Sequence, residues 1–181
     1  MSKNKTILIF NGKGGVGKDY LANVLNNTEY YKVKVVSSVD KIKEAFSIIG
    51  WNGNKSLEVR AGLAELKQMS VTLFDHPYKY MIEECRKFIE EDTYHNILIL
   101  MIREIEEIRR MKESISKLYD KNKVYSVLID KPGVENIEYG NIADDDVYKY
   151  KDEYDIKFTN VFNNPRSDEL FVSIINCYTM I

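Results

Sequence analysis

The chain has 181 residues, a length that fits one compact domain with a sizeable buried core. Its hydrophobic fraction of 44% and charged fraction of 30% are ordinary for globular proteins and exclude a largely disordered chain. A formal net charge of −2 provides no overall basic field for nucleic acid, and no apolar run approaches the ~18–20 residues of a membrane span. The two cysteines, Cys85 and Cys177, match neither a metal motif nor a disulfide framework. We therefore expect residues 1–181 to form one soluble, cytoplasmic domain with no nucleic-acid or membrane partner.

The first third of the chain predicts a strand, a loop and a helix, followed by a second strand and helix. The opening residues lead directly into an apolar run at residues 6–11, which predicts a buried strand and not a signal peptide. Glycine-rich residues 12–17 follow, and residues 19–26 carry apolar side chains at helical spacing. Residues 32–38 then predict a second strand, and residues 41–49 predict a helix that ends before a glycine.

The middle third predicts longer helices around the most apolar strand. Residues 56–72 and 77–91 have the spacing of amphipathic helices, and the second of these has a proline in its first turn. Residues 96–102 are the most apolar stretch of the chain, which indicates a central strand. A charged surface helix is expected at residues 104–119, and residues 123–129 predict a fourth strand.

The last third predicts a long loop before a final strand and helix. Residues 132–153 are irregular, acidic and rich in tyrosine, and loops of this length are usually lids or binding loops. Residues 154–160 predict the last strand and residues 167–178 a closing helix. Strands that alternate with helices and have continuous apolar runs indicate a parallel sheet covered on both faces. We therefore predict a three-layer, doubly wound α/β domain with about five strands.

A glycine-rich motif lies between the first strand and the first helix. Residues 12–18 read GKGGVGK, which satisfies the G-x-x-x-x-G-K pattern in its expected setting. Glycines allow positive φ and turn successive N–H groups towards a phosphate, and the helix N-terminus adds partial positive charge. The final lysine can reach the β- and γ-phosphates of a nucleotide. The motif predicts an ATP site formed by Gly12, Lys13, Gly14, Gly15, Val16, Gly17, Lys18, Asp19 and Tyr20.

Asp19 stands where the standard motif has Ser or Thr to hold Mg²⁺. A carboxylate can still hold Mg²⁺, directly or through water, because Mg²⁺ is a hard ion that retains waters. The alternative is that Asp19 only caps the helix, where the helix dipole favours an acidic residue. We predict Asp19 as the metal-binding residue, and the two roles are compatible.

The segment GKGGVGKDY (residues 12–20) resembles the G-K-D variant of the P-loop in phage-type deoxynucleoside monophosphate kinases and animal-type phosphomevalonate kinases. The likeness to the phage-type family continues, in the same order, over most of the chain. It includes SSVDKIKEAFSIIGW (37–51), VRAGLAELK (59–67), ILMIREIEEI (99–108), KPG (131–133) and GNIADDDVYKY…YDIKFTN (140–160).

This resemblance implies a fold of the P-loop NTPase kinase type, with ATP and Mg²⁺ as co-substrates and a (deoxy)nucleoside monophosphate as phosphoryl acceptor. It implies an acceptor-binding helical segment at about residues 52–92 and a lid-like loop at about residues 132–153. A phage origin, which only the resemblance suggests, would place the protein in the host cytoplasm.

KGGVGK alone also resembles the deviant P-loop of partitioning and division-site ATPases, in which Lys13 would be the signature lysine. That family requires Thr at position 19, later switch aspartates and a longer chain, and the sequence has none of these. We therefore expect Lys13 to be a solvated loop residue near the phosphates.

Several charged residues near the second strand and in the next helices are candidates for acceptor binding. Arg60 and Lys67 are seven residues apart and share one helix face, where they either clamp an acceptor phosphate or form ordinary solvated surface. Lys43 matches a position of the family just after the second strand and has the same two interpretations. Asp40 follows the second strand at the edge where ligands bind in open α/β sheets. It either orients or deprotonates the acceptor, or it caps the following helix.

Arg103 and Lys131 end the third and fourth strands at this same edge. Arg103 can neutralise charge on the transferring phosphoryl group, or it can pair with a neighbouring glutamate. Lys131 precedes Pro-Gly and is a candidate phosphate contact. Trp51 can stack on a base or belong to the core, while His76 and His95 stand alone and suggest no metal or relay.

The predicted catalytic residues are Lys18, Arg103, Asp40 and Lys131. The third strand ends in Met101 without an acid of the Walker B kind, and residues 132–153 contain no arginine, although P-loop kinases commonly deliver arginines from a lid. These departures leave open a nucleotide-binding regulator or a partitioning-type ATPase without a small-molecule acceptor. A kinase of another phosphorylated metabolite also stays open, as do the base and sugar preference and a homodimeric state.

Overall fold

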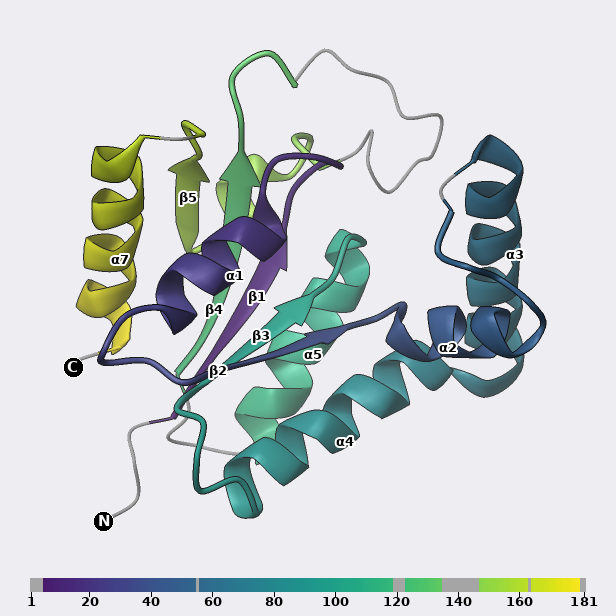
Figure 1. Cartoon of the computed structure of the whole chain (residues 1–181). Helices are drawn as coiled ribbons and strands as arrows, with labels where there is room; N and C mark the ends of the chain where they lie inside the picture. Colours follow the sequence, from purple (N-terminus) through teal and green to yellow (C-terminus); the bar gives the residue numbers. More distant parts are fainter. Residues whose placement is uncertain (1–4, 55, 119–122, 135–146, 163, 180–181) are drawn as a thin grey trace.

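The computed structural model describes residues 5–54, 56–118, 123–134, 147–162 and 164–179, which form a five-stranded sheet between helices (Figure 1). The strands are β1 (Thr6–Asn11), β2 (Val33–Ser37), β3 (Ile97–Met101), β4 (Lys123–Asp130) and β5 (Ile156–Thr159). The helices are α1 (Lys18–Asn26), α2 (Asp40–Ile48), α3 (Leu57–Phe74), α4 (His76–Glu90), α5 (Ile105–Leu118) and α7 (Pro165–Thr179), with a 3-10 turn at Lys151–Glu153. The strand order is β2-β3-β1-β4-β5 and every pairing is parallel, so the predicted three-layer α/β fold is confirmed.

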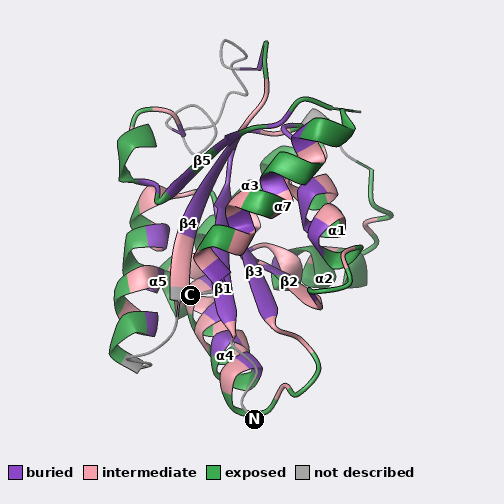
Figure 2. Cartoon of the chain, turned by 90° about the vertical axis from the view of Figure 1, so that its left-hand side faces the viewer, coloured by how far each residue is buried: buried purple, intermediate pink, exposed green. Residues whose placement is uncertain are grey.

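The central strand β1 shows why the strands read as continuous apolar runs. Successive side chains of a strand point to opposite faces of the sheet. Leu8 and Phe10 therefore pack with α1 and α7 on one face, while Ile7 and Ile9 pack with α4 and α5 on the other. Figure 2 shows the buried strands between these helix layers. Because both faces are covered, neither set of alternating positions can be polar.

The carboxyl ends of the strands meet at one edge of the sheet. β1 continues into α1 on one face, whereas its neighbour β3 continues into α5 on the opposite face. The chain thus leaves the two strands in opposite directions, which makes this edge a topological switch point. In open α/β sheets this is the place where ligands bind.

The segment formed by α2 and α3 stands beside the sheet and not on either face (Figure 1). None of the described side chains of α3 is buried. The helix runs two residues further than the predicted residues 56–72, and Asp75, with a φ of 51°, turns the chain directly into α4. Arg110 of α5 pairs with the Asp75 carboxylate at 2.6 and 2.8 Å. This ion pair therefore ties the turn at the end of the segment to the core.

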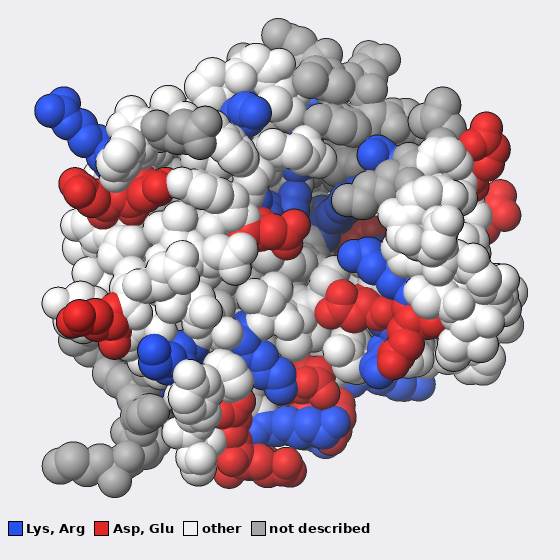
Figure 3. Space-filling model, viewed as in Figure 1, with Lys and Arg blue, Asp and Glu red and all other residues white. Residues whose placement is uncertain are grey.

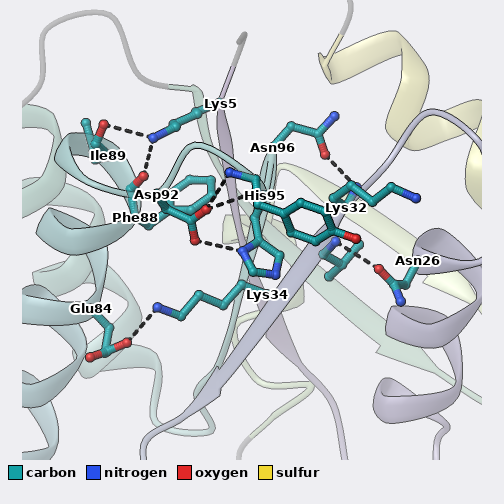
Figure 4. Close-up of polar contacts among 12 residues, drawn as sticks. Lys5, Asn26, Lys32, Lys34, Glu84, Phe88, Ile89, Asp92, His95 and Asn96 are labelled. Atoms are coloured by element: carbon teal, nitrogen blue, oxygen red, sulfur yellow. Dashed lines mark hydrogen bonds and ion pairs between the residues drawn. The ribbon is translucent and has the colours of Figure 1, made fainter. Parts of the chain in front are cut away.

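The opposite, amino-terminal edge of the sheet is held by polar contacts (Figure 4). Asn96 accepts a hydrogen bond from the Lys32 N–H at 2.8 Å, and the Lys5 ammonium group donates to carbonyl groups at the end of α4. The imidazole Nδ1 of His95 lies 2.7 Å from the Asp92 carboxylate. His95 was expected to stand alone, but it has this acidic partner, far from the carboxyl edge of the strands.

No helix in the described part of the chain combines the length and the apolar run needed to cross a bilayer.

Candidate phosphate-binding site

The loop of residues 12–17 connects β1 to α1 and has the backbone of a phosphate cradle. Gly12, Gly15 and Gly17 all have positive φ, at 148°, 78° and 91°. A Cβ on Gly12 would lie 2.2 Å from the Ile129 carbonyl oxygen, and one on Gly17 would lie 2.4 Å from the Nδ2 of Asn160. Glycine is therefore required at both positions by conformation and by space. The loop therefore has the glycine-dependent backbone that the motif predicts, and its binding of nucleotide phosphates stays a prediction.

Lys18 begins α1, and its ammonium group lies against the loop. It donates hydrogen bonds to the carbonyl oxygens of Gly12 and Lys13, the latter at 2.9 Å. Gly17 is the N-cap residue and has no side chain to satisfy the first-turn N–H groups of α1. A helix start of this kind attracts anions. The charge of Lys18 and the helix N-terminus thus meet at one loop, which gives the site a local positive field in a chain of net negative charge.

Two buried asparagines hold the two ends of the loop, and neither is among the predicted site residues. Asn11 accepts a hydrogen bond from the Gly12 N–H at 2.7 Å. Asn160, the first residue after β5, donates from its Nδ2 to the Val16 carbonyl at 2.9 Å. Both side chains are 0% exposed. For Asn11, a polar residue at the end of an otherwise apolar strand was the signal that could have identified it, because buried polar groups need partners.

Lys13 is buried, so the expectation of a solvated lysine is wrong. Its side chain is 4% exposed, and its ammonium nitrogen lies 5.3 Å from the centre of the Tyr148 ring. The Tyr148 hydroxyl in turn donates to the Asp130 carboxylate at the end of β4. The tyrosine-rich segment was the signal that could have indicated this burial, because its residue Tyr148 packs against Lys13. A phosphate contact of Lys13 stays a prediction.

Asp19 is the second residue of α1, where its exposed carboxylate interacts favourably with the helix dipole. It does not cap the helix, since the N-cap position belongs to Gly17. No group of three His, Cys, Asp or Glu side chains in the described ranges is arranged to hold a metal ion. A site for Mg²⁺ would therefore consist of one carboxylate with phosphate and water oxygens, which is compatible with the preferences of this ion.

Tyr20 and Lys131, predicted from different parts of the sequence, meet at a third residue. The rings of Tyr20 and Phe162 stack with centroids 5.1 Å apart, and the Lys131 ammonium lies 4.7 Å from the Phe162 ring centre. Phe162 follows β5 and is 41% exposed. The Tyr20 hydroxyl donates to Asp168 of α7 at 2.5 Å, which fixes this ring beside the loop. An exposed aromatic surface thus borders the phosphate cradle.

Asp40 and Lys43 lie after β2 at the same edge of the sheet. Asp40 is the first residue of α2, and Val39 is the N-cap, so the interpretation of Asp40 as a cap is wrong. The Asp40 carboxylate instead accepts a hydrogen bond from the Ser37 N–H at 2.7 Å and fixes the turn between β2 and α2. Lys43 is exposed on α2. The acceptor roles of both residues stay predictions.

Arg60 and Lys67 lie on α3, as predicted, but their surroundings differ. Arg60 is exposed in the first turn of the helix. Lys67 is only 15% exposed and pairs with Glu104, with Glu107 3.8 Å away. The charge of Lys67 is therefore largely compensated, and the two cations do not form one free face. Their roles in acceptor binding stay predictions, with Arg60 the more accessible of the two.

Glu104 and Glu107 have opposite pKa shifts although they share one lysine. Burial, together with the charge on Glu104, raises the pKa of Glu107 to about 7. Burial alone would also raise the pKa of Glu104, but the Lys67 ammonium keeps it below its ordinary value. One of the two acids thus carries the charge that pairs with Lys67, and the other tends to hold a proton near neutral pH.

Arg103 lies just past the end of β3, and its carbonyl oxygen accepts a hydrogen bond from Asn11 at 2.8 Å. The strand ends in Met101, which is 9% exposed, so this position carries no acid.

Trp51 packs its ring 6.2 Å from the ring of Phe46 and donates to the Asn54 carbonyl at 2.7 Å. It belongs to the connection between α2 and α3.

The space-filling view shows a hollow between the core and the helical segment α2–α3 (Figure 3). Basic side chains lie at the floor of this hollow and on its wall, next to acidic ones (Figure 3). Most of the predicted lid-like loop, residues 135–146, lies outside the described residues.

No protein-family model matches the chain, and neither does any curated protein. Solved structures do match. A protein of Chloroflexus aurantiacus proposed to be a kinase has 11% identity and a TM-score of 0.59, covering 99% of this chain and 98% of its own. The shikimate kinase of Aquifex aeolicus has 14% identity and a TM-score of 0.52, covering 95% and 94%. That of Acinetobacter baumannii has 12% identity and a TM-score of 0.50, covering 97% and 93%.

At these identities the likeness shows the fold, which is the three-layer α/β fold of the P-loop kinases. The resemblance to the phage-type family remains a prediction.

Proposed function

We propose that this protein is an ATP-dependent kinase that transfers a phosphoryl group to a (deoxy)nucleoside monophosphate and releases ADP and the nucleoside diphosphate. The observation that carries the proposal is the phosphate cradle at residues 12–18, which lies at the switch point of a sheet with this fold. The helical segment beside that edge leaves a hollow for an acceptor (Figure 3).

The donor is held by the loop and by the aromatic surface next to it. The backbone N–H groups of the loop and the Lys18 ammonium bind the β- and γ-phosphates. The partly exposed surface that Phe162 forms with Tyr20 and Lys131 is suited to the nucleoside end of the donor. Asp19 would hold Mg²⁺, which would offset negative charge on the phosphates.

The acceptor is held on the opposite side of the hollow. Arg60, exposed in the first turn of α3, offers a planar guanidinium that binds a phosphate through two parallel hydrogen bonds. Lys43 adds a second cation, and Asp40, the first residue of α2, can orient the acceptor. Lys67 anchors α3 to the core through its ion pairs with Glu104 and Glu107.

The transfer step breaks the bond between the γ-phosphorus and the β,γ-bridging oxygen and forms a bond from an acceptor phosphate oxygen to the same phosphorus. Lys18 stabilises the negative charge that builds up on the β-phosphate, and Arg103 stabilises the charge on the transferring phosphoryl group. No covalent enzyme intermediate is needed, since positioning and charge stabilisation account for catalysis of this kind.

The test is ADP release from Mg-ATP by the purified protein, measured with a panel of ribo- and deoxynucleoside monophosphates. We expect one or a few acceptors to stimulate turnover and Lys18→Ala to reduce it by about 100-fold or more. Lys117→Ala, which removes an exposed lysine of α5, is the matched control and should keep full turnover.

A second candidate is a nucleotide-binding protein without a small acceptor. Met101 at the end of β3 and the compensated charge of Lys67 favour it. ATP binding without stimulation by any monophosphate would support this candidate and contradict the kinase.

A further inference from the structure

Asn11 is the last residue of β1, and its buried carboxamide contacts three different segments of the chain. Its Oδ1 accepts a hydrogen bond from the Gly12 N–H at 2.7 Å. Its Nδ2 donates to the Arg103 carbonyl at 2.8 Å and to the Tyr154 hydroxyl at 2.6 Å. Both donor hydrogens and one acceptor position are thus used. A fully buried amide with these bonds holds its partners at fixed distances from one another.

The three partners belong to the parts that a phosphoryl transfer has to align. Gly12 is the first peptide of the phosphate cradle, and Arg103 is the predicted stabiliser of the transferring group. Tyr154 closes the long connection from β4 to β5 and is 5% exposed. Next to it, Glu153 forms a charged pair with Arg109 of α5, so this end of the connection is anchored on the core.

The other end of the cradle is held independently of Asn11. Asn160 binds the Val16 carbonyl, and its own N–H donates to the Asp130 carbonyl at 2.8 Å. The turn into α1, which carries Lys18, is therefore fixed from β4 and β5. The entry to the cradle is fixed from the chain after β3, where the Asn11 side chain bonds the Arg103 carbonyl and the Ile102 N–H donates to the Phe10 carbonyl at 3.2 Å.

We infer that Asn11 is a positioning residue for phosphoryl transfer. It holds the backbone of Arg103 at a fixed distance from Gly12, the first residue of the phosphate cradle. This inference rests on the proposed function. Asn11 itself is fully buried, so it acts through the groups that it bonds. Its loss leaves the turn at Val16 and Lys18 intact, so it lowers kcat and leaves the KM for ATP nearly unchanged. A misplacement of about 1 Å at a reacting group costs on the order of 100-fold in rate.

The variant Asn11→Asp tests this because it keeps the size and the oxygen that accepts from Gly12. It replaces the donor to the Arg103 carbonyl with an oxygen, which repels that carbonyl. We expect kcat to fall by about 10- to 100-fold and the KM for ATP to stay within about threefold of wild type. Asn11→Ser is neutral but too short to reach the Arg103 carbonyl, so it should also lower kcat and leave the KM for ATP nearly unchanged. It replaces the aspartate variant in this test if that variant does not fold.

Asn96→Asp is the matched control. Asn96 also bridges chain segments through its carboxamide, with 2.8 Å bonds to the Lys32 N–H and the Tyr30 carbonyl, but at the opposite edge of the sheet (Figure 4). It should lower the midpoint of thermal unfolding without changing kcat. A folded Asn11→Asp protein with wild-type kcat, or an equal loss of kcat in Asn96→Asp, would overturn the inference.

Hydrogen exchange separates this inference from the proposed function. Asn11→Asp and Asn11→Ser should speed exchange in peptides that cover residues 9–14 and 100–106, whatever the reaction is. Exchange that stays at the wild-type rate in both peptides would overturn the positioning role. Wild-type protein that shows no turnover with any acceptor, but the expected exchange in the variants, would contradict the proposed function alone.

Discussion

Gly15 and Gly17 have similar left-handed backbones but different surroundings. A Cβ on Gly17 would approach the Asn160 amide to 2.4 Å and the Phe162 ring to 2.8 Å, whereas a Cβ on Gly15 would meet nothing within 4 Å. We therefore expect Gly15→Ala to cost about 1–2 kcal/mol from backbone strain alone. Gly17→Ala should cost more, about 2–4 kcal/mol, because the clash adds to that strain. Urea unfolding of both variants checks this, and equal losses would contradict the close approach at Gly17.

At the scale of elements, Lys67 of α3 pairs with Glu104 and Glu107 at the start of α5, and the pKa of Glu107 makes this contact respond to pH. The Glu107 carboxyl faces Glu104, Lys67 and Asp75, and its pKa is about 7 in the folded protein against an ordinary 4.5. A raised pKa means that the folded protein binds this proton more tightly than the unfolded chain. The stability that results is fully present below about pH 4.5 and is lost as the pH rises through 7.

Glu107→Gln removes this titration while it keeps the shape of the protonated form. We expect the variant to gain stability relative to wild type between pH 5 and pH 8, on the order of 2 kcal/mol. Urea unfolding at several pH values measures the difference. Glu113→Gln on the same helix is the control, because Glu113 is exposed and a hydrogen bond from Lys117 lowers its pKa. The interpretation fails if the free energies of unfolding of Glu107→Gln and wild type change with pH in parallel.

The elements themselves could be predicted because their signals are local. The run at residues 6–11 is β1 to the residue, and the glycine pattern located the cradle. The contacts of the site could not be predicted, since they join distant segments. Lys67 meets Glu104 37 residues further along the chain, and no spacing rule connects them. The same holds for Lys13, whose burial depends on Tyr148, and for Asn160, which reaches the loop only after β5 has joined the sheet.

For the whole molecule, stability comes from two apolar layers that share one sheet. Phe171 of α7 is 0% exposed and lies between the rings of Phe158 and Phe10, with centroids 4.8 and 6.1 Å away. Its neighbour Leu170 is 56% exposed on the same helix. Truncation of a buried aromatic residue removes apolar contacts and leaves a cavity, which typically costs 3–5 kcal/mol. An exposed leucine makes few apolar contacts, so its truncation removes little packing. The two positions therefore differ in how far the fold buries them.

We therefore expect Phe171→Ala to lower the free energy of unfolding by about 3–5 kcal/mol and Leu170→Ala by about 0.5 kcal/mol or less. Urea unfolding followed by far-UV circular dichroism measures both. Because β1 contributes to both layers through its alternating side chains, damage on the α7 face should shift the unfolding of the whole sheet as one transition. Two separate transitions in Phe171→Ala, or similar losses in the two variants, would show that α7 is not part of a shared core.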